Sequence, residues 1–280
     1  MQAGLDIDIA RNDWKNAAIQ ASNLSELYLT IGDVRQALAY AEQSVGLADK
    51  SGDWEKYMVS RTTFANALHQ LNQFSKAQSA FNDAEEMQQK KQPGFSLLYS
   101  LRGFQYCDLL LSQENYAEVE RRANQTLDWS NKYFGKGLGL LDIALDNLSL
   151  GRAHLLHLQH DPNFPITELQ TIFNRAVDGL RQAGQQDELP RGLLARAEYY
   201  RLVGDFEKAK RDLDEAFTIA TRGGMGLYLA DCHLEYARLH LAKDEKAKAR
   251  EQWQIAKDSI EKMGYHRRDK EMQELEEELK

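Results

Sequence analysis

The sequence predicts an all-α protein built from repeated pairs of antiparallel helices. Only 4 of the 280 residues are proline, the residue that helix interiors tolerate least. Apolar residues recur at three- and four-residue steps, which is the spacing of one helix face. Turn signals recur at a nearly constant interval, because Gly32, Asn72 and Glu114 are separated by 40 and 42 residues, and Gly204 and Asp244 by 40.

The clearest helix pair lies in residues 191–222. Gly204 can end the first helix in the left-handed conformation, and the Asp205 side chain can cap the second. The predicted stripe of the first helix is Leu193, Leu194, Ala197, Tyr200 and Leu202. That of the second is Phe206, Ala209, Leu213, Ala216, Phe217 and Ala220. Such a pair leaves one apolar face open, so it needs neighbouring pairs to cover that face.

We expect residues 1–280 to form a single domain of six such helix pairs. The two ends of this domain differ from each other. The expected pairs cover about 14–50, 54–91, 96–132, 140–183, 187–222 and 227–262. Residues 1–12 align with the end of a second helix, which predicts the remnant of a preceding repeat in a piece of a longer array. Residues 267–280 carry apolar side chains on one side only, which predicts a C-terminal capping helix.

Two irregular stretches interrupt the predicted array. In the fourth pair, the loop 159–165 replaces the tight turn. The glycine-rich stretch 135–139 lacks the spacing of a phosphate-binding loop and has no preceding strand. We therefore interpret it as a joint between repeats.

Composition excludes several classes of function. The chain is 42% hydrophobic and 28% charged, with a net charge of -8, which argues against binding a nucleic-acid backbone. There is no run of 18 apolar residues and no secretory signal, so we expect no membrane span and a cytoplasmic location. Cys107 and Cys232 lie in apolar helical stripes, which predicts buried free thiols.

No catalytic, metal or cofactor site is expected. His154, His157 and His160 are spaced by three, and histidines at this spacing can share a helix face, as metal binding requires. No cysteine or carboxylate completes the set, so we interpret them as a solvated helix end, with His160 in the following loop. The nucleophile and metalloprotease motifs are absent from the sequence, so an enzyme is not predicted.

The pattern of residues 191–222 resembles the tetratricopeptide repeat. That family places a small residue, then an aromatic at +3, glycine at +7, alanine at +12, a large apolar residue at +16 and alanine at +19. The matching residues are Ala197, Tyr200, Gly204, Ala209, Leu213 and Ala216. The resemblance implies a right-handed superhelix, an α-solenoid, that binds a protein or peptide in its concave groove. The period near 40 exceeds the usual value of about 34 residues and is similar to the arrays of kinesin light chains and of bacterial signalling ATPases.

In the resembling family, fixed positions on the first helix of each pair line the groove. Carried onto this sequence, they are Asn66, His69, Asp108, Arg152, Arg191, Glu198, Arg201, Asp231 and Arg238. Each arginine can bind a carboxylate or phosphate of the partner through two parallel hydrogen bonds. The alternative is that these charges pair with each other across adjacent repeats. On the first interpretation, Arg201→Glu with Arg238→Glu is expected to weaken partner binding without unfolding the chain.

Two relatives make more specific predictions. Chaperone-tail-binding arrays have Lys and Asn at positions that are Ser22 and Glu26 here, so that adaptor role is not expected. Residues 183–197, 226–242 and 265–280 resemble the C-terminal sensor arrays of bacterial STAND-class signalling NTPases. This implies a non-catalytic interaction module that senses a partner for a larger signalling protein. The alternatives are a spacer or a scaffold that self-associates through the N-terminal repeat edge, and a small-molecule sensor.

Overall fold

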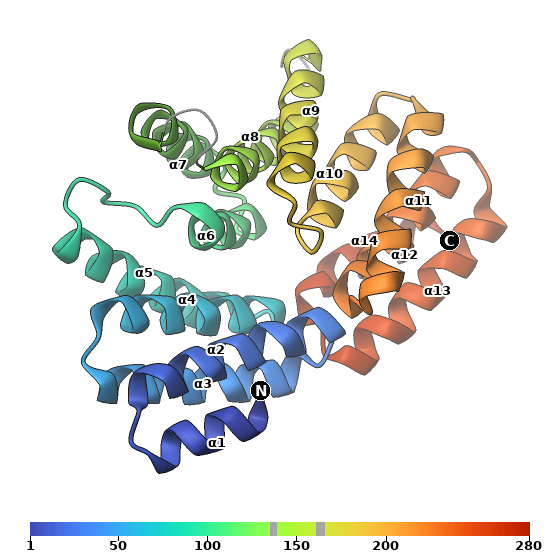
Figure 1. Cartoon of the computed structure of the whole chain (residues 1–280). Coiled ribbons are helices and arrows are strands. Elements are labelled where there is room, and N and C mark those ends of the chain that lie inside the picture. The colour runs from blue at the N-terminus through green and yellow to red at the C-terminus, as the bar shows by residue number, and fades with distance from the viewer. Residues whose placement is uncertain (135–138, 161–165) are drawn as a thin grey trace. The chain divides into compact units, whose positions relative to one another are not determined.

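The computed structural model describes residues 1–134, 139–160 and 166–280, and these residues form fourteen α-helices and no strand (Figure 1). Successive helices pack against each other as antiparallel pairs, so the predicted all-α solenoid class is confirmed. Residues 135–138 of the expected joint and 161–165 of the expected loop lie outside the described residues.

The chain divides into two compact units. Unit 1 comprises Met1–Leu98 with Glu261–Arg267, and unit 2 comprises Tyr99–Ile260 with Arg268–Lys280. The helices of unit 1 are α1 (Gln2–Ala10), α2 (Trp14–Ile31), α3 (Val34–Ser51), α4 (Trp54–Gln70) and α5 (Phe74–Lys91). Leu5 of α1 is buried in a core shared with alanines of α2, and Tyr40 of α3 joins the same core.

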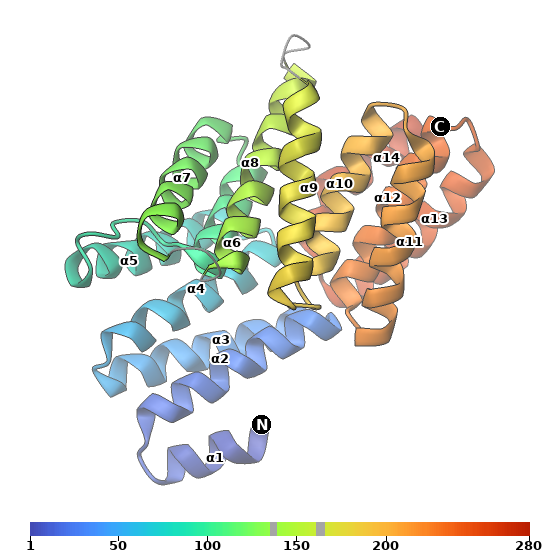
Figure 2. The same ribbon diagram turned by 45° about the horizontal axis from the view of Figure 1, so that its top comes forward.

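Unit 2 holds the remaining pairs. Its helical elements are α6 (Ser100–Ser112), α7 (Tyr116–Trp129), the π-helical turn η1 (Ser130–Phe134), α8 (Leu140–His160), α9 (Ile166–Ala183), α10 (Leu189–Leu202), α11 (Phe206–Gly223), α12 (Gly226–Ala242), α13 (Lys246–Met263), the 3-10 turn η2 (His266–Arg268) and α14 (Asp269–Glu278). The last residues of α13 and most of η2 belong to unit 1. Figure 2 shows α8, α9, α10 and α11 following one another in chain order.

The predicted turns are confirmed by the backbone. Gly32 and Gly204 adopt φ of 91° and 81°, a region that glycine enters without a steric cost. Asn72, Glu114 and Asp244 adopt the same left-handed conformation at 60°, 61° and 59°. A helix therefore ends at each position where the sequence places a turn signal.

The core of unit 2 follows the predicted stripes with one exception. Leu193, Ala197 and Tyr200 are buried as expected, and Asp205 caps α11 by accepting from the Lys208 N–H at 3.2 Å. Leu202 was expected in the same stripe but is 43% exposed. The prediction was wrong because two residues past Tyr200 is a rotation of about 200° around a helix.

Close packing and burial explain other details of unit 2. A side chain at Gly151 would meet Phe173 at 2.9 Å, so α8 and α9 can touch only because this position is glycine.

Cys107 and Cys232 are buried free thiols, as predicted. His160, expected in the loop, is instead the last residue of α8.

Candidate functional site

Charged side chains on the first helices of unit 2 form a continuous chain of ion pairs, which we call the ionic ladder. It runs from α10 across α12 to η2 and α14. Its members are Glu198, Arg201, Glu235, Arg238, Glu271, Arg268 and Asp231. Four of the nine sequence candidates, Glu198, Arg201, Asp231 and Arg238, are thus brought into one network. These contacts match the alternative interpretation of the sequence, in which the charges pair with each other across adjacent repeats.

The first step of the ladder joins α10 to α12. The Arg201 guanidinium donates to Glu235 at 2.5 Å, and Arg238 contacts the other oxygen of the same carboxylate at 3.4 Å. The Glu235 side chain is only 6% exposed. Burial lowers the pKa of Arg201, but Glu235 raises it more, so the guanidinium keeps its charge. A buried carboxylate shared by two arginines ties neighbouring repeats together.

The second step joins α12 to α14. Arg238 donates to Glu271 at 2.7 Å, and Arg268 donates to Asp231 at 2.8 and 2.9 Å and to Glu271 at 2.5 Å. Burial alone would raise the pKa of Glu271, but Arg268 and Arg238 hold it below its usual range. Every arginine of the ladder is therefore already bound to carboxylates of this chain.

Glu198 is the least paired member of the ladder. Among the described residues, its carboxylate makes one ion contact, at 4.0 Å from Arg201, and its side chain is 31% exposed. Burial, and next the negative charge of Glu235, raise its pKa above the ordinary glutamate value. A carboxylate in this position retains unused capacity to accept hydrogen bonds.

The remaining candidates of unit 2 also have internal partners. Arg152 donates to the buried Asp108 at 2.7 Å. Arg191 lies 2.6 Å from Glu188, and its guanidinium faces the rings of Phe104 and Tyr228 at 5.1 and 5.7 Å from their centres. Burial lowers the pKa of Arg191, but Glu188, Tyr228 and Asp108 together keep the pKa above the ordinary value.

The two candidates of unit 1 lie in different surroundings. The Asn66 side chain accepts from Gln70 at 2.9 Å. His69 is fully buried, and its ring centre lies 5.7 Å from that of Phe74. The structure thus places this imidazole in the core of its helix pair.

The other histidines have local roles. His154 and His157 approach the Glu120 carboxylate at 3.6 and 3.4 Å. His154 is mostly buried, and this burial lowers its pKa, so of these two histidines only His157 fits the expected solvated helix end. The part of the chain that the structure describes contains no group of three side chains placed to hold a metal ion.

Sequence reasoning missed Glu235, Glu271 and Glu188, which partner the predicted arginines, and Arg268, which partners the predicted Asp231. A sequence signal for some of them exists. Arg201 and Glu235 are 34 residues apart, and Arg238 and Glu271 are 33 apart. Opposite charges separated by nearly one repeat could therefore have indicated pairing between repeats.

Comparisons with known proteins agree with this fold. Residues 16–90 match the tetratricopeptide repeat family. No curated protein matches the sequence significantly. One similar solved structure is the crystal structure of a Rap protein complexed with Competence and Sporulation Factor. It covers 91% of this chain and 73% of that chain, with a TM-score of 0.60 and 13% identity.

At this identity the likeness to the Rap protein shows the fold alone. None of the described helices is long and apolar enough to cross a membrane. Residues 16–90 thus match the tetratricopeptide repeat family, and the chain shares a helical-repeat fold with the Rap protein over most of its length.

Proposed function

We propose that this chain is a non-catalytic protein-interaction module that binds a peptide or protein on the first-helix face of unit 2. The ionic ladder is the observation that carries the proposal. Charges held in place by ion pairs lose little freedom when a partner binds, and their fixed pattern selects and orients that partner. The Rap structure is named as a complex with Competence and Sporulation Factor, which supports a binding role for a similar fold.

Glu198 is the group through which the ladder contacts the partner in this proposal. The ladder arginines already bind Glu235, Glu271 and Asp231, whereas the Glu198 carboxylate is partly exposed and weakly paired. A donor group of the partner can reach it without breaking an existing ion pair. A hydrogen bond to a charged group contributes about 1.5–3 kcal/mol.

The test begins with capture of the natural partner by the chain, with and without its adjoining sequence. The affinity of the identified partner is then measured by calorimetry for wild type and for Glu198→Gln. We expect the variant to bind about tenfold more weakly. Glu207→Gln on the exposed side of α11 is the matched control. Equal affinity of wild type and Glu198→Gln would remove this face from the binding site.

The ion pairs change the result expected for Arg201→Glu with Arg238→Glu. These substitutions would leave the buried Glu235 carboxylate among like charges, and breaking a buried pair in this way costs about 3–5 kcal/mol. The double variant is therefore expected to unfold unit 2. It is not a clean test of binding.

We also propose that the module is the sensor region of a larger bacterial signalling protein of the STAND class. The resemblance of residues 183–197, 226–242 and 265–280 supports this context. If it is correct, the natural full-length protein will hydrolyse a nucleoside triphosphate at a rate that the captured partner changes. A full-length protein without a nucleotide-binding region would exclude the STAND context while leaving the binding proposal intact.

Self-association is a second candidate function, favoured by exposed apolar side chains in unit 1. Ile7 of α1 and Ile31 of α2 are 50% and 49% exposed. Light scattering over a range of concentrations distinguishes the two functions. A mass that rises with concentration in wild type, but not in Ile7→Glu, would favour the scaffold.

A further inference from the structure

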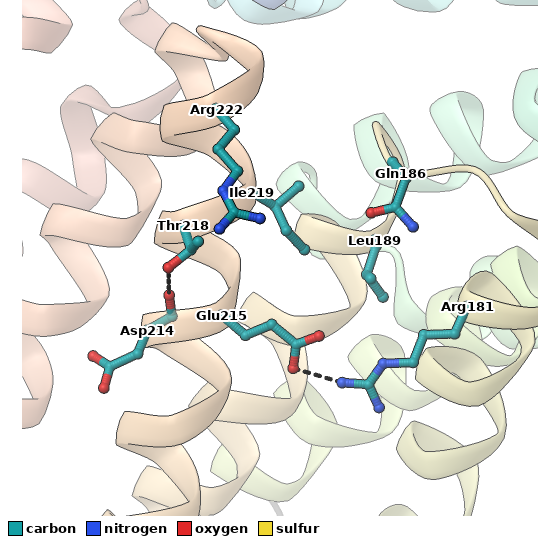
Figure 3. A pocket seen from close by; sticks show the side chains of 8 residues that line it. All are labelled: Arg181, Gln186, Leu189, Asp214, Glu215, Thr218, Ile219 and Arg222. Atoms are coloured by element: carbon teal, nitrogen blue, oxygen red, sulfur yellow. Dashed lines mark hydrogen bonds and ion pairs between the residues drawn. The ribbon is translucent and has the colours of Figure 1, made fainter.

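A second surface of unit 2, formed by α9, α10 and α11, is hollowed and carries unpaired positive charge. Two adjoining hollows, of about 520 and 280 Å³, share Arg181 and Glu215 as lining residues. We call them together the α9–α11 trough. Figure 3 shows the larger hollow, with Glu215, Ile219 and Arg222 on α11 facing Arg181, Gln186 and Leu189.

The ion pair between Arg181 and Glu215 lies where the two hollows meet. The guanidinium and carboxylate are 2.5 Å apart, and the side chains are 41% and 37% exposed. An exposed pair of this kind contributes little to stability. A carboxylate from outside can therefore replace Glu215 on Arg181 and join the hollows into one continuous trough.

Positive charge exceeds negative charge along the trough. Arg211 and Arg222, both exposed, form no hydrogen bond or ion pair with any residue that the structure describes. Arg196 is satisfied internally, because it donates to Asp212 at 2.7 and 3.0 Å. The lining holds five bases and three acids in all. This local excess contrasts with the net charge of -8 for the whole chain.

The trough is elongated, and an apolar side chain lies among its charged ones. Lys208, Arg211, Glu215, Ile219 and Arg222 follow one another along α11 at three- and four-residue steps. They extend over roughly 21 Å of helix, at 1.5 Å per residue. An extended peptide of about six or seven residues has this length. A single phosphate or carboxylate would occupy only a small part of it.

We propose that the α9–α11 trough binds an acidic segment of a protein partner that carries apolar side chains among its carboxylates. The carboxylates pair with Arg181, Arg211 and Arg222, and the apolar side chains contact Leu189 and Ile219. Arginine suits this role because its guanidinium binds a carboxylate through two parallel hydrogen bonds. This site is separate from the ionic ladder and does not depend on the function proposed for it.

The first experiment measures direct binding of a labelled peptide by fluorescence anisotropy. The probe is an extended peptide of about seven residues that contains both glutamate and leucine, and the reference peptide has glutamine in place of glutamate. We expect the whole chain to bind the acidic peptide more tightly than the reference peptide. Arg211→Glu with Arg222→Glu should weaken this binding about tenfold or more.

The matched control is Arg175→Glu with Lys262→Glu, which changes the net charge equally at exposed residues outside the trough. An equal loss of affinity in the control would overturn the proposal, because it would show attraction by overall charge. Equal binding of the two peptides by wild type would also overturn it. Displacement of the peptide by inorganic phosphate, but not by chloride at the same ionic strength, would assign the trough to phosphate groups and exclude an acidic peptide.

The second experiment predicts a gain of affinity, which a loss of folding cannot imitate. Glu215→Gln removes the carboxylate that competes for Arg181 and keeps the shape of the side chain. We expect this variant to bind the acidic peptide several-fold more tightly than wild type. Unchanged or weaker binding would show that the peptide does not replace Glu215, and would overturn the proposed arrangement.

Discussion

Asp146 of α8 has its carboxyl group buried inside unit 2. Asp146 is only 7% exposed, and among the described residues its Oδ2 atom has no hydrogen-bond partner. Burial raises its pKa to about 8; a hydrogen bond with Thr126 opposes this shift, and the negative charge of Asp142 adds to it. The folded protein therefore keeps this carboxyl protonated at neutral pH.

The raised pKa predicts how stability depends on pH. In the unfolded chain Asp146 ionises near pH 4, whereas in the folded chain it stays protonated to about pH 8. The folded state thus binds the extra proton, so this group makes stability fall as pH rises from 4 to 8. Asp146→Asn should remove that dependence and stabilise the protein by about 1–3 kcal/mol at pH 8.

Urea denaturation at several pH values measures this effect. Asp83→Asn, at an exposed position of α5, is the control and should change neither the midpoint nor its pH dependence. If Asp146→Asn destabilises the protein at pH 8, the carboxyl group is ionised and stabilised by partners in the folded state, contrary to the prediction.

Burial also predicts the reactivity of a cysteine. It raises the pKa of the Cys107 thiol to about 12, and the thiolate is the reactive form of cysteine. We expect Cys107 to resist a thiol reagent at pH 8 in the folded protein and to react rapidly in urea. Mass spectrometry of the labelled peptides checks this, and rapid labelling without urea would show that α6 opens readily.

At the scale of the helices, one substitution made at two glycines should have opposite effects. Gly204 ends α10 at φ 81°, where a side chain costs about 1–2 kcal/mol. Gly46 lies within α3, and a side chain there would meet no atom within 4 Å. Gly204→Ala should therefore destabilise the protein, whereas Gly46→Ala should stabilise it by about 0.5–1 kcal/mol. Thermal unfolding measures both, and shifts of the same sign would contradict the assigned backbone conformations.

The helices were the part of the structure most readily predicted from sequence. Gly204 and Asn72 mark turns because few other residues adopt the left-handed conformation, and the stripe of α11 follows directly from helical spacing. Leu202 was misassigned because its apolar character was weighed above its position on the helix. His160 was placed in a loop because Asp161 and Pro162 follow it closely.

At the scale of the whole molecule, the candidate sites were less predictable than the helices. The arginine positions followed from the repeat pattern, but their partners depend on which side chains of adjacent repeats meet. Arg201 and Glu235 lie on different helices, and neither helix alone indicates their contact at 2.5 Å. The α9–α11 trough likewise depends on how three helices pack together, and this packing cannot be inferred from the sequence of any one of them.

The ionic ladder makes a prediction about stability. Arg201→Met would leave the buried Glu235 carboxylate with only the 3.4 Å contact to Arg238, and we expect a loss of about 3 kcal/mol. Lys210→Met breaks a pair with Asp214 in which both side chains are about half exposed, so its effect should stay within about 0.5 kcal/mol. Urea denaturation compares the two variants, and equal effects would show that the ladder adds no more than a surface pair.

The ladder also limits how this array can be redesigned or recombined. Arg238 contacts carboxylates on its own repeat and on α14, and Glu235 binds an arginine of the preceding repeat. A repeat moved alone into another array would lack the charged partners that its side chains bind here. The charged residues of its former neighbours would lose their partners as well. The segment from α10 to α14 should therefore be inherited and exchanged as one block, whereas repeats joined by apolar contacts alone can be shuffled one at a time.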